Sequence, residues 1–201
     1  MKLATSGHQK SIVSERNEPA EAETIRNLAR FVRDVELKNG VSVTMRAIRT
    51  SDAPLLARFH EKLSERSVHL RYFSSISLSS RIAPDQLART CRISDRDFAL
   101  VAVVKREGTG EQAIIALGQM ARHNGPHEVE LGLIVTDDFQ NQALGTRMCE
   151  CLLEISRAAG DHHMTSLISW ENHAMRHIAR QFGCDLKFVL GENAACATLA
   201  F

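Results

Sequence analysis

The clearest alternation of apolar and polar positions in the chain lies at residues 129–135 and predicts a strand. Its apolar members are Val129, Leu131, Leu133 and Val135. Downstream, the period changes to that of a helix, with apolar residues at Leu144, Met148, Leu152, Ile155 and Ala159. Gly160 follows where a C-terminal cap is expected. The segment is therefore predicted to form a strand, an acidic turn and a long amphipathic helix.

The rest of the chain changes between the same two periods, which predicts one α/β domain with a mixed sheet. Strands are expected at residues 41–48, 98–104, 113–120 and 164–168, with short strands near the C-terminus. Helices are expected from Pro19 to Lys38, after a cap at Ser51 or Asp52, from Pro84, and from about Asn172 to Phe182. The Ser- and Arg-rich passage at residues 64–81 is interpreted as a substrate-facing loop or a solvated connection.

Composition narrows the class of protein. A chain of 201 residues with 44% hydrophobic content can bury a proper core. Its net charge of +1 argues against nucleic acid as the main partner, because proteins that follow phosphate backbones are usually basic. The sequence has no apolar run that approaches a membrane span, and its N-terminus lacks the apolar core of a signal peptide. Five cysteines without a CxxC pair indicate reduced thiols in a cytoplasmic protein.

The junction between the strand and the long helix is a candidate anion site. The first N–H groups of a helix lack intrahelical partners, and the helix dipole adds positive charge there. The junction sequence, Gln140-Asn141-Gln142-Ala143-Leu144-Gly145, resembles the coenzyme-A-binding motif Q/R-x-x-G-x-G/A of the GNAT superfamily of N-acyltransferases. Ala143 replaces the first glycine, where close backbone approach or a positive φ is wanted, so binding is expected to be weakened at most.

Three further passages carry the resemblance. Residues 171–175, followed by Gly183, look like the family's E-N-x-x-x…G-F segment. Residues 45–52 resemble the R-P-x-x-P-x-D opening of the bacterial protein lysine acetyltransferases, and residues 63–73 resemble their L-S-x-x-S-x-x-x-R-F-F passage. The resemblance implies a GNAT fold, a mixed and mostly antiparallel twisted sheet flanked by helices, over residues 41–201. Residues 1–40 would then be an N-terminal extension with an amphipathic helix.

The same resemblance implies acetyl-CoA as the acyl donor and no metal. It assigns donor binding to Ile134, Val135, Gln140, Asn141, Gln142, Ala143, Leu144, Gly145, Thr146 and Asn172. For Asn172 two interpretations remain open: a hydrogen bond to the pantetheine arm, and an ordinary helix N-cap. His173 and His177 have the i, i+4 spacing of a zinc pair, but no third ligand is evident and a surface pair is favoured.

The chemistry requires a base. Acyl transfer needs a neutral amine, whereas a free lysine has a pKa of about 10.4. Glu130 lies mid-strand, ten residues before Gln140, and in the resembling lysine acetyltransferases a glutamate at that spacing is the proposed general base. A solvated strand carboxylate is the competing interpretation, and Glu128, on the same face, is the reserve candidate. Gly132 is expected to leave open space for the pantetheine arm or the incoming amine.

A general acid is not identified. Many GNAT enzymes place a tyrosine seven residues after the asparagine, and that position here is Ala179. The lysine acetyltransferase branch also tends to carry alanine there. The only tyrosine of the chain, Tyr72, lies in a different predicted element.

The acceptor is expected to be a protein lysine. A small amine such as a polyamine or an aminoglycoside is the first alternative, and a CoA-binding regulatory module with weak catalysis is the second. Arg66, Arg71 and Arg81 in the 64–81 passage favour an acidic protein surface over a small polycation. The N-terminal helix is expected to pack its apolar stripe on the domain or on a second copy of the chain, so a homodimer stays open.

Overall fold

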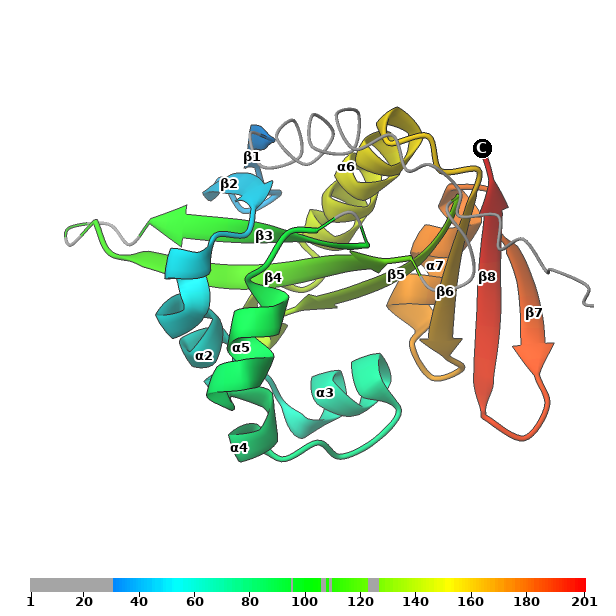
Figure 1. Ribbon diagram of the computed structural model, residues 1–201, viewed down its shortest axis with the longest axis horizontal. Coiled ribbons are helices and arrows are strands. Elements are labelled where there is room, and N and C mark those ends of the chain that lie inside the picture. The colour runs from blue at the N-terminus through cyan, green and yellow to red at the C-terminus, as the bar shows by residue number, and fades with distance from the viewer. Residues whose placement is uncertain (1–30, 95, 106–107, 109, 123–126) are drawn as a thin grey trace, which may run out of the picture.

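The computed structural model describes residues 31–94, 96–105, 108, 110–122 and 127–201. Eight strands form one sheet in the order β1-β2-β3-β4-β5-β6-β8-β7 (Figure 1). Their bounds are β1 Val32–Glu36, β2 Ser42–Ala47, β3 Asp97–Lys105, β4 Gln112–Ala121, β5 Glu128–Val135, β6 His163–Ser169, β7 Asp185–Val189 and β8 Ala194–Ala200. Neighbouring strands are antiparallel except β5 and β6. The mixed, mostly antiparallel sheet predicted from the sequence is confirmed.

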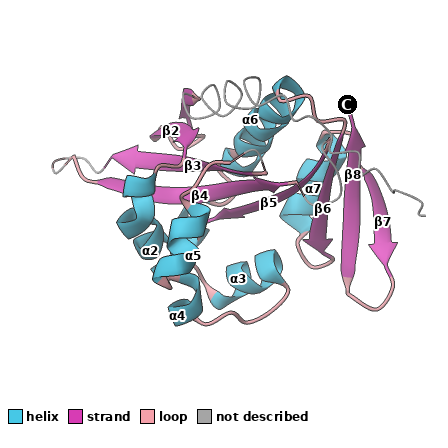
Figure 2. Ribbon diagram, viewed as in Figure 1, coloured by secondary structure: helices cyan, strands magenta, loops and turns pink. Residues whose placement is uncertain are grey.

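Helices cover both faces of this sheet (Figure 2). They are α2 Ala53–Glu61, α3 Glu65–Tyr72, α4 Leu78–Arg81, α5 Pro84–Thr90, α6 Leu144–Ala158 and α7 His173–Gln181, with short 3₁₀ turns at Thr50–Asp52 and Asp137–Phe139. Leu56, Phe59 and Val68 of α2 and α3 share one core with Leu117 and Ile134. Residues of α6 form a second core with the opposite face, and α7 packs beside it.

The predicted helix from Pro19 to Lys38 is wrong over residues 32–36, which form β1. Residues 19–30 of that prediction lie outside the described part of the chain. Val32–Glu36 pairs antiparallel with β2, and Arg33 binds Glu154 of α6 with Nη–Oε distances of 3.2 and 2.6 Å. The free edge of β2 offers backbone hydrogen bonds, and such tertiary pairing overrides a short local pattern. The sheet thus begins before residue 41, where the sequence analysis placed the domain.

The 64–81 passage is also not a loop, because it contains α3 and α4. Ser64 begins α3 as an N-cap, its Oγ accepting from Ser67 N at 3.2 Å. Ser77 does the same for α4 by accepting from Ser80 N. Serine caps satisfy helix N–H groups that would otherwise lack partners, so the serines of this passage start helices rather than break them.

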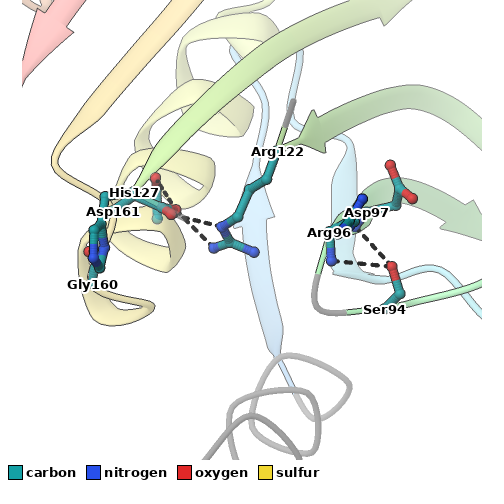
Figure 3. A network of polar contacts seen from close by, with 8 residues as sticks. Ser94, Arg96, Asp97, Arg122, His127, Gly160 and Asp161 are labelled. Atoms are coloured by element: carbon teal, nitrogen blue, oxygen red, sulfur yellow. Dashed lines mark hydrogen bonds and ion pairs between the residues drawn. The ribbon is translucent and has the colours of Figure 1, made fainter. Parts of the chain in front are cut away.

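Two buried ion pairs fix the ends of elements. Arg46 holds Asp52 through Nη–Oδ bonds of 2.6 and 2.8 Å, so this carboxylate binds an arginine instead of capping α2. Burial alone would raise the pKa of Asp52, but the hydrogen bonds and charge of Arg46 hold it below its usual value. Arg122, just after β4, binds Asp161 at 2.7 and 2.9 Å (Figure 3). Ser156 Oγ donates to the same carboxylate at 2.7 Å.

The parallel strands β5 and β6 pair only at their starts. Their register joins Glu128–Glu130 to His163–Thr165, and the strands then continue without pairing to Val135 and Ser169. The polar groups along the remainder of β5 therefore face a gap in the sheet on the β6 side. That gap positions the candidate site.

Candidate active site

A cavity of about 870 Å³ lies where β5 and β6 separate. Its walls are the end of β5, the loop that leads into α6, and α7. Eight of the ten residues predicted to bind the donor line it: Ile134, Val135, Gln140, Asn141, Ala143, Gly145, Thr146 and Asn172. Gln142 does not line the cavity, and the Leu144 side chain is buried in the core instead. The volume falls in the range of about 300–1,000 Å³ typical of ligand sites.

The loop before α6 has an unusual backbone. Asn141 and Ala143 have φ of 61° and 65°, and Ala143 is the N-cap of α6 without a side-chain cap bond. The need for a residue that tolerates a positive φ at position 143 is thus confirmed, and alanine meets it at a cost. At Gly145 an added Cβ would lie 3.2 Å from Ile178 Cδ1. The first N–H groups of α6 consequently open onto the cavity with their dipole, which suits a phosphate group.

A polar network fastens this loop to α3. Asp137 accepts from Ser64 N at 3.1 Å, from Ser64 Oγ at 2.8 Å and from Ser67 Oγ at 3.0 Å. Gln140 Nε2 donates to Ser67 Oγ and to Val135 O, both at 3.1 Å. Burial would raise the pKa of Asp137, but the hydrogen bonds from the two serines outweigh it and hold the pKa below its usual value. The Gln140 side chain therefore shapes the loop.

Asn172 lies at the start of α7, where its Oδ1 accepts from Met175 N at 3.0 Å. The N-cap interpretation is thus confirmed. The residue also lines both the large cavity and a second one beside it. His173 binds Arg176 through Nδ1 at 2.7 Å, and within the described residues no group of three or more His, Cys, Asp and Glu side chains could hold a metal.

Glu130 lines the second cavity, of about 190 Å³, and is exposed. The space expected beside Gly132 is not open, however, because the guanidinium of Arg71 occupies it. A Cβ added at Gly132 would lie 2.7 Å from Arg71 Nε and closer still to Cζ and Nη2. A Cβ atom cannot lie so close to these atoms, so any side chain at position 132 would require the guanidinium of Arg71 to move.

Arg71 was expected only as part of a possible substrate-facing passage, and neither it nor Tyr72 was among the predicted site residues. Both lie at the end of α3 and line the second cavity with Glu130. Helical spacing within residues 63–73 was the available signal, since Ser67 and Arg71 are four residues apart and share one face of a helix. Ala179, by contrast, is buried against Ile168 and Ala197, and neither cavity is lined by it.

Comparisons with known proteins agree with the family resemblance of the sequence. Residues 42–185 match the family model described as Acetyltransferase (GNAT) domain. The chain is 28% identical over 157 residues to Acetyltransferase PA5475 of Pseudomonas aeruginosa, which covers 76% of this chain and 78% of that protein. The GNAT domain of S. lividans PAT is similar in structure, with a TM-score of 0.73, 19% identity, and coverage of 85% of this chain and 97% of that one.

A further structural neighbour was solved with a ligand. The PaiA N-acetyltransferase of Thermoplasma acidophilum, in complex with coenzyme A, has a TM-score of 0.62 and 12% identity, and the match covers 79% of this chain and 99% of that chain. At these identities the two structures establish the fold. Among the helices in the described part of the chain, none is long and apolar enough to cross a membrane.

Proposed function

The chain belongs to the GNAT acetyltransferase family, and we propose that it transfers the acetyl group of acetyl-CoA to a protein lysine with Glu130 as general base. Membership of the family, shown by a match over residues 42–185, makes it an acetyltransferase that uses acetyl-CoA as donor. The acceptor and the base are the proposal. The observation that carries it is the charge of the second cavity.

The donor side of the site fits the chemistry of coenzyme A. The uncapped N-terminus of α6 and the left-handed residues Asn141 and Ala143 offer backbone N–H groups to a diphosphate. The unpaired side of β5 supports binding of the pantetheine arm, which carries amide groups able to pair with a strand edge. Lys38 also lines this cavity and adds positive charge.

Glu130 has the position that a base needs. It lies on β5 next to the point where β5 and β6 separate, opposite Thr165 on β6 and Ala121 on β4. Its exposed carboxylate can take a proton from an incoming ammonium directly or through water, after which the neutral amine attacks the thioester. One proton ends on Glu130. As the tetrahedral adduct collapses, the nitrogen releases its second proton to solvent, the acetyl group stays on the nitrogen, and the sulfur leaves as thiolate.

The second cavity argues against a small polycation. Glu130 is its only carboxylate among the described lining residues, and Arg71 is its only basic group. A polyamine or an aminoglycoside carries several ammonium groups, which need paired charges when they lose water. A single lysine ammonium needs only one carboxylate, and this supports a lysine acceptor.

Of the three arginines in the 64–81 passage that the sequence offered in support of a protein acceptor, Arg81 has a structural role instead. Arg81 donates to the carbonyl oxygens of Ile76 and His60 at 3.2 and 2.9 Å, so its guanidinium stabilises the α2–α4 region. Arg66 stays exposed on α3. Leu167, an exposed apolar side chain at the wall of the second cavity, adds a further contact for an acceptor.

Glu130→Gln tests the base. The variant keeps the shape and removes the proton acceptor, so kcat should fall by roughly 10²–10⁴-fold while acetyl-CoA affinity stays unchanged. Thiol release is measured with lysine peptides, protein substrates and spermidine as acceptors. Glu128→Gln, on the same strand face, is the matched control. Wild-type turnover in Glu130→Gln would show that the residue is a solvated carboxylate, and efficient spermidine acetylation without peptide acetylation would refute the lysine acceptor.

A further inference from the structure

Arg71 carries a charge that no carboxylate of the described residues neutralises. Among the described residues, its side chain makes one hydrogen bond, from Nη2 to Gln119 Oε1 at 3.3 Å, and its Nε is buried without a hydrogen-bond partner. The Tyr72 ring lies 5.0 Å from its Cζ and gives a cation–π contact. Leaving a buried donor of a charged group without an acceptor costs free energy. Such a group is poised to receive an anionic ligand.

The guanidinium lies at the centre of the site. It is packed on Gly132, and Gln119 stands opposite Gly132 on β4. Glu130 is two residues earlier on β5 and therefore on the same face of the sheet. Arg71 lines both the donor cavity and the second cavity, so it marks the junction at which acyl group and acceptor meet.

The fold around α3 and Gly132 positions Arg71. It belongs to α3, whose N-terminus is held by the Ser64, Ser67 and Asp137 network, and Gly132 provides a flat surface for the guanidinium. A rigid, planar fork of donors is the group that proteins use to bind a carboxylate in two-point fashion. This arrangement lowers the entropy lost on binding.

We propose that Arg71 binds a carboxylate that the acceptor carries next to its reacting amine, while Glu130 meets the amine. This inference rests on the proposed function for the identity of the amine. The two positions on β5 are two residues apart, which is about 7 Å. That spacing suits a lysine amine with a carboxylate on an adjacent residue or at the chain's own C-terminus. An α-amine and its carboxylate, joined through one carbon, are too close to reach both groups.

Paired peptides test the carboxylate. Two peptides differ only in one residue next to the lysine, aspartate in one and asparagine in the other. The wild-type enzyme should show at least a tenfold lower KM for the aspartate peptide. Arg71→Gln should bring this ratio close to one, and Arg71→Lys, which keeps the charge without the fork, should fall between. Arg66→Gln is the matched control, because Arg66 lies on the same helix, is exposed and lines neither cavity.

Gly132→Ala provides a second, independent variant. The added methyl group displaces the guanidinium, so carboxylate preference should be lost although Arg71 is still present. In the Arg71→Gln background the same change should leave the ratio unaltered. Melting temperature and acetyl-CoA affinity show whether each variant is folded.

Several outcomes would overturn the inference. Equal KM for the two peptides with the wild-type enzyme would do so, as would a carboxylate preference that survives Gly132→Ala. If Arg71→Gln lowered kcat equally for both peptides, Arg71 would act on the transferring acetyl group instead.

Free lysine and cadaverine, which differ only by the carboxylate, separate this inference from the proposed function. If the enzyme did not acetylate peptides but still preferred lysine over cadaverine, and lost that preference in Arg71→Gln, only the protein acceptor would be refuted. If it neither acetylated peptides nor preferred lysine, both the protein acceptor and the carboxylate-binding role of Arg71 would be refuted.

Discussion

Replacing Asp137 with asparagine should loosen the loop that we propose binds the donor. Asp137 is the only acidic acceptor for Ser64 N, Ser64 Oγ and Ser67 Oγ among the described residues, and all three bonds measure 2.8–3.1 Å. Asparagine keeps one acceptor oxygen, but its NH2 group would point N–H donors at the N–H and O–H groups that now donate to Asp137. Because Gln140 binds Ser67, the disturbance passes from α3 into the loop before α6.

The size of the effect follows from the contacts. A hydrogen bond to a charged group contributes about 1.5–3 kcal/mol when buried. Asp137 is exposed, so solvent screening reduces this value, and the sum for the network is about 1–2 kcal/mol of unfolding free energy. If most of that free energy holds the loop in its binding conformation, the Kd for acetyl-CoA rises roughly five- to tenfold.

Urea unfolding and calorimetry measure both quantities, with Asp138→Asn as the matched control. Because the folded pKa of Asp137 is lowered, its contribution is present above the unfolded pKa of about 3.9 and is lost as pH falls through the folded pKa. The difference between wild type and Asp137→Asn should therefore be constant from about pH 5 to 8 and shrink below about pH 4. An Asp137→Asn protein that matches Asp138→Asn in stability and affinity would refute the reasoning.

Three further predictions concern stability. Ala143→Gly should raise the free energy of unfolding by about 0.5–1 kcal/mol, because glycine relieves the positive φ of 65°, and a lower urea midpoint would contradict this. Arg46→Met should lower it by about 3–5 kcal/mol by leaving Asp52 buried and unpaired, and Arg46→Met with Asp52→Leu should recover much of the loss; equal losses would argue against the ion pair. His60 has its pKa lowered to about 4 by burial and then by the charge of Arg81, so the unfolded chain takes up a proton first as pH falls from about 6.5. The free energy of unfolding of the wild type, measured by melts, should fall by at most about 3 kcal/mol between pH 6.5 and 4, and His60→Leu should lack this pH dependence. An unchanged pH dependence in His60→Leu would assign it to another group.

The elements that the sequence predicted well are those whose signals are local. The strand at residues 129–135 is β5, and the helix that follows runs over Leu144–Ala158 with Gly160 at φ 79° after its end. Asn172 caps α7 as its type and position indicate. Period, cap and left-handed glycine are each decided by a few neighbouring residues, so one chain is enough to find them.

The failures occurred where distant segments decide the outcome. Val32–Glu36 has apolar residues that fit a helical stripe, and only the edge of β2 makes it a strand. Likewise, Gly132 alone suggests free space, and only the return of α3 onto β5 shows that Arg71 fills it. Neither contact leaves a periodic trace in the sequence, because the partners lie 6 to 14 residues apart in the first case and 61 in the second.

The two passages that resemble the lysine acetyltransferases, residues 45–52 and 63–73, have a structural role that the sequence alone does not show. Arg46 and Asp52 form a buried pair that fixes the turn into α2, and Ser64 and Ser67 fasten α3 to the loop after β5. Neither pair touches the place where Glu130 lies. The serine contacts act through position: they hold α3, and α3 carries Arg71 against Gly132 near Glu130. A substitution at Ser64 or Ser67 should therefore alter acceptor discrimination through Arg71, while the carboxylate of Glu130, carried by β5, stays in place.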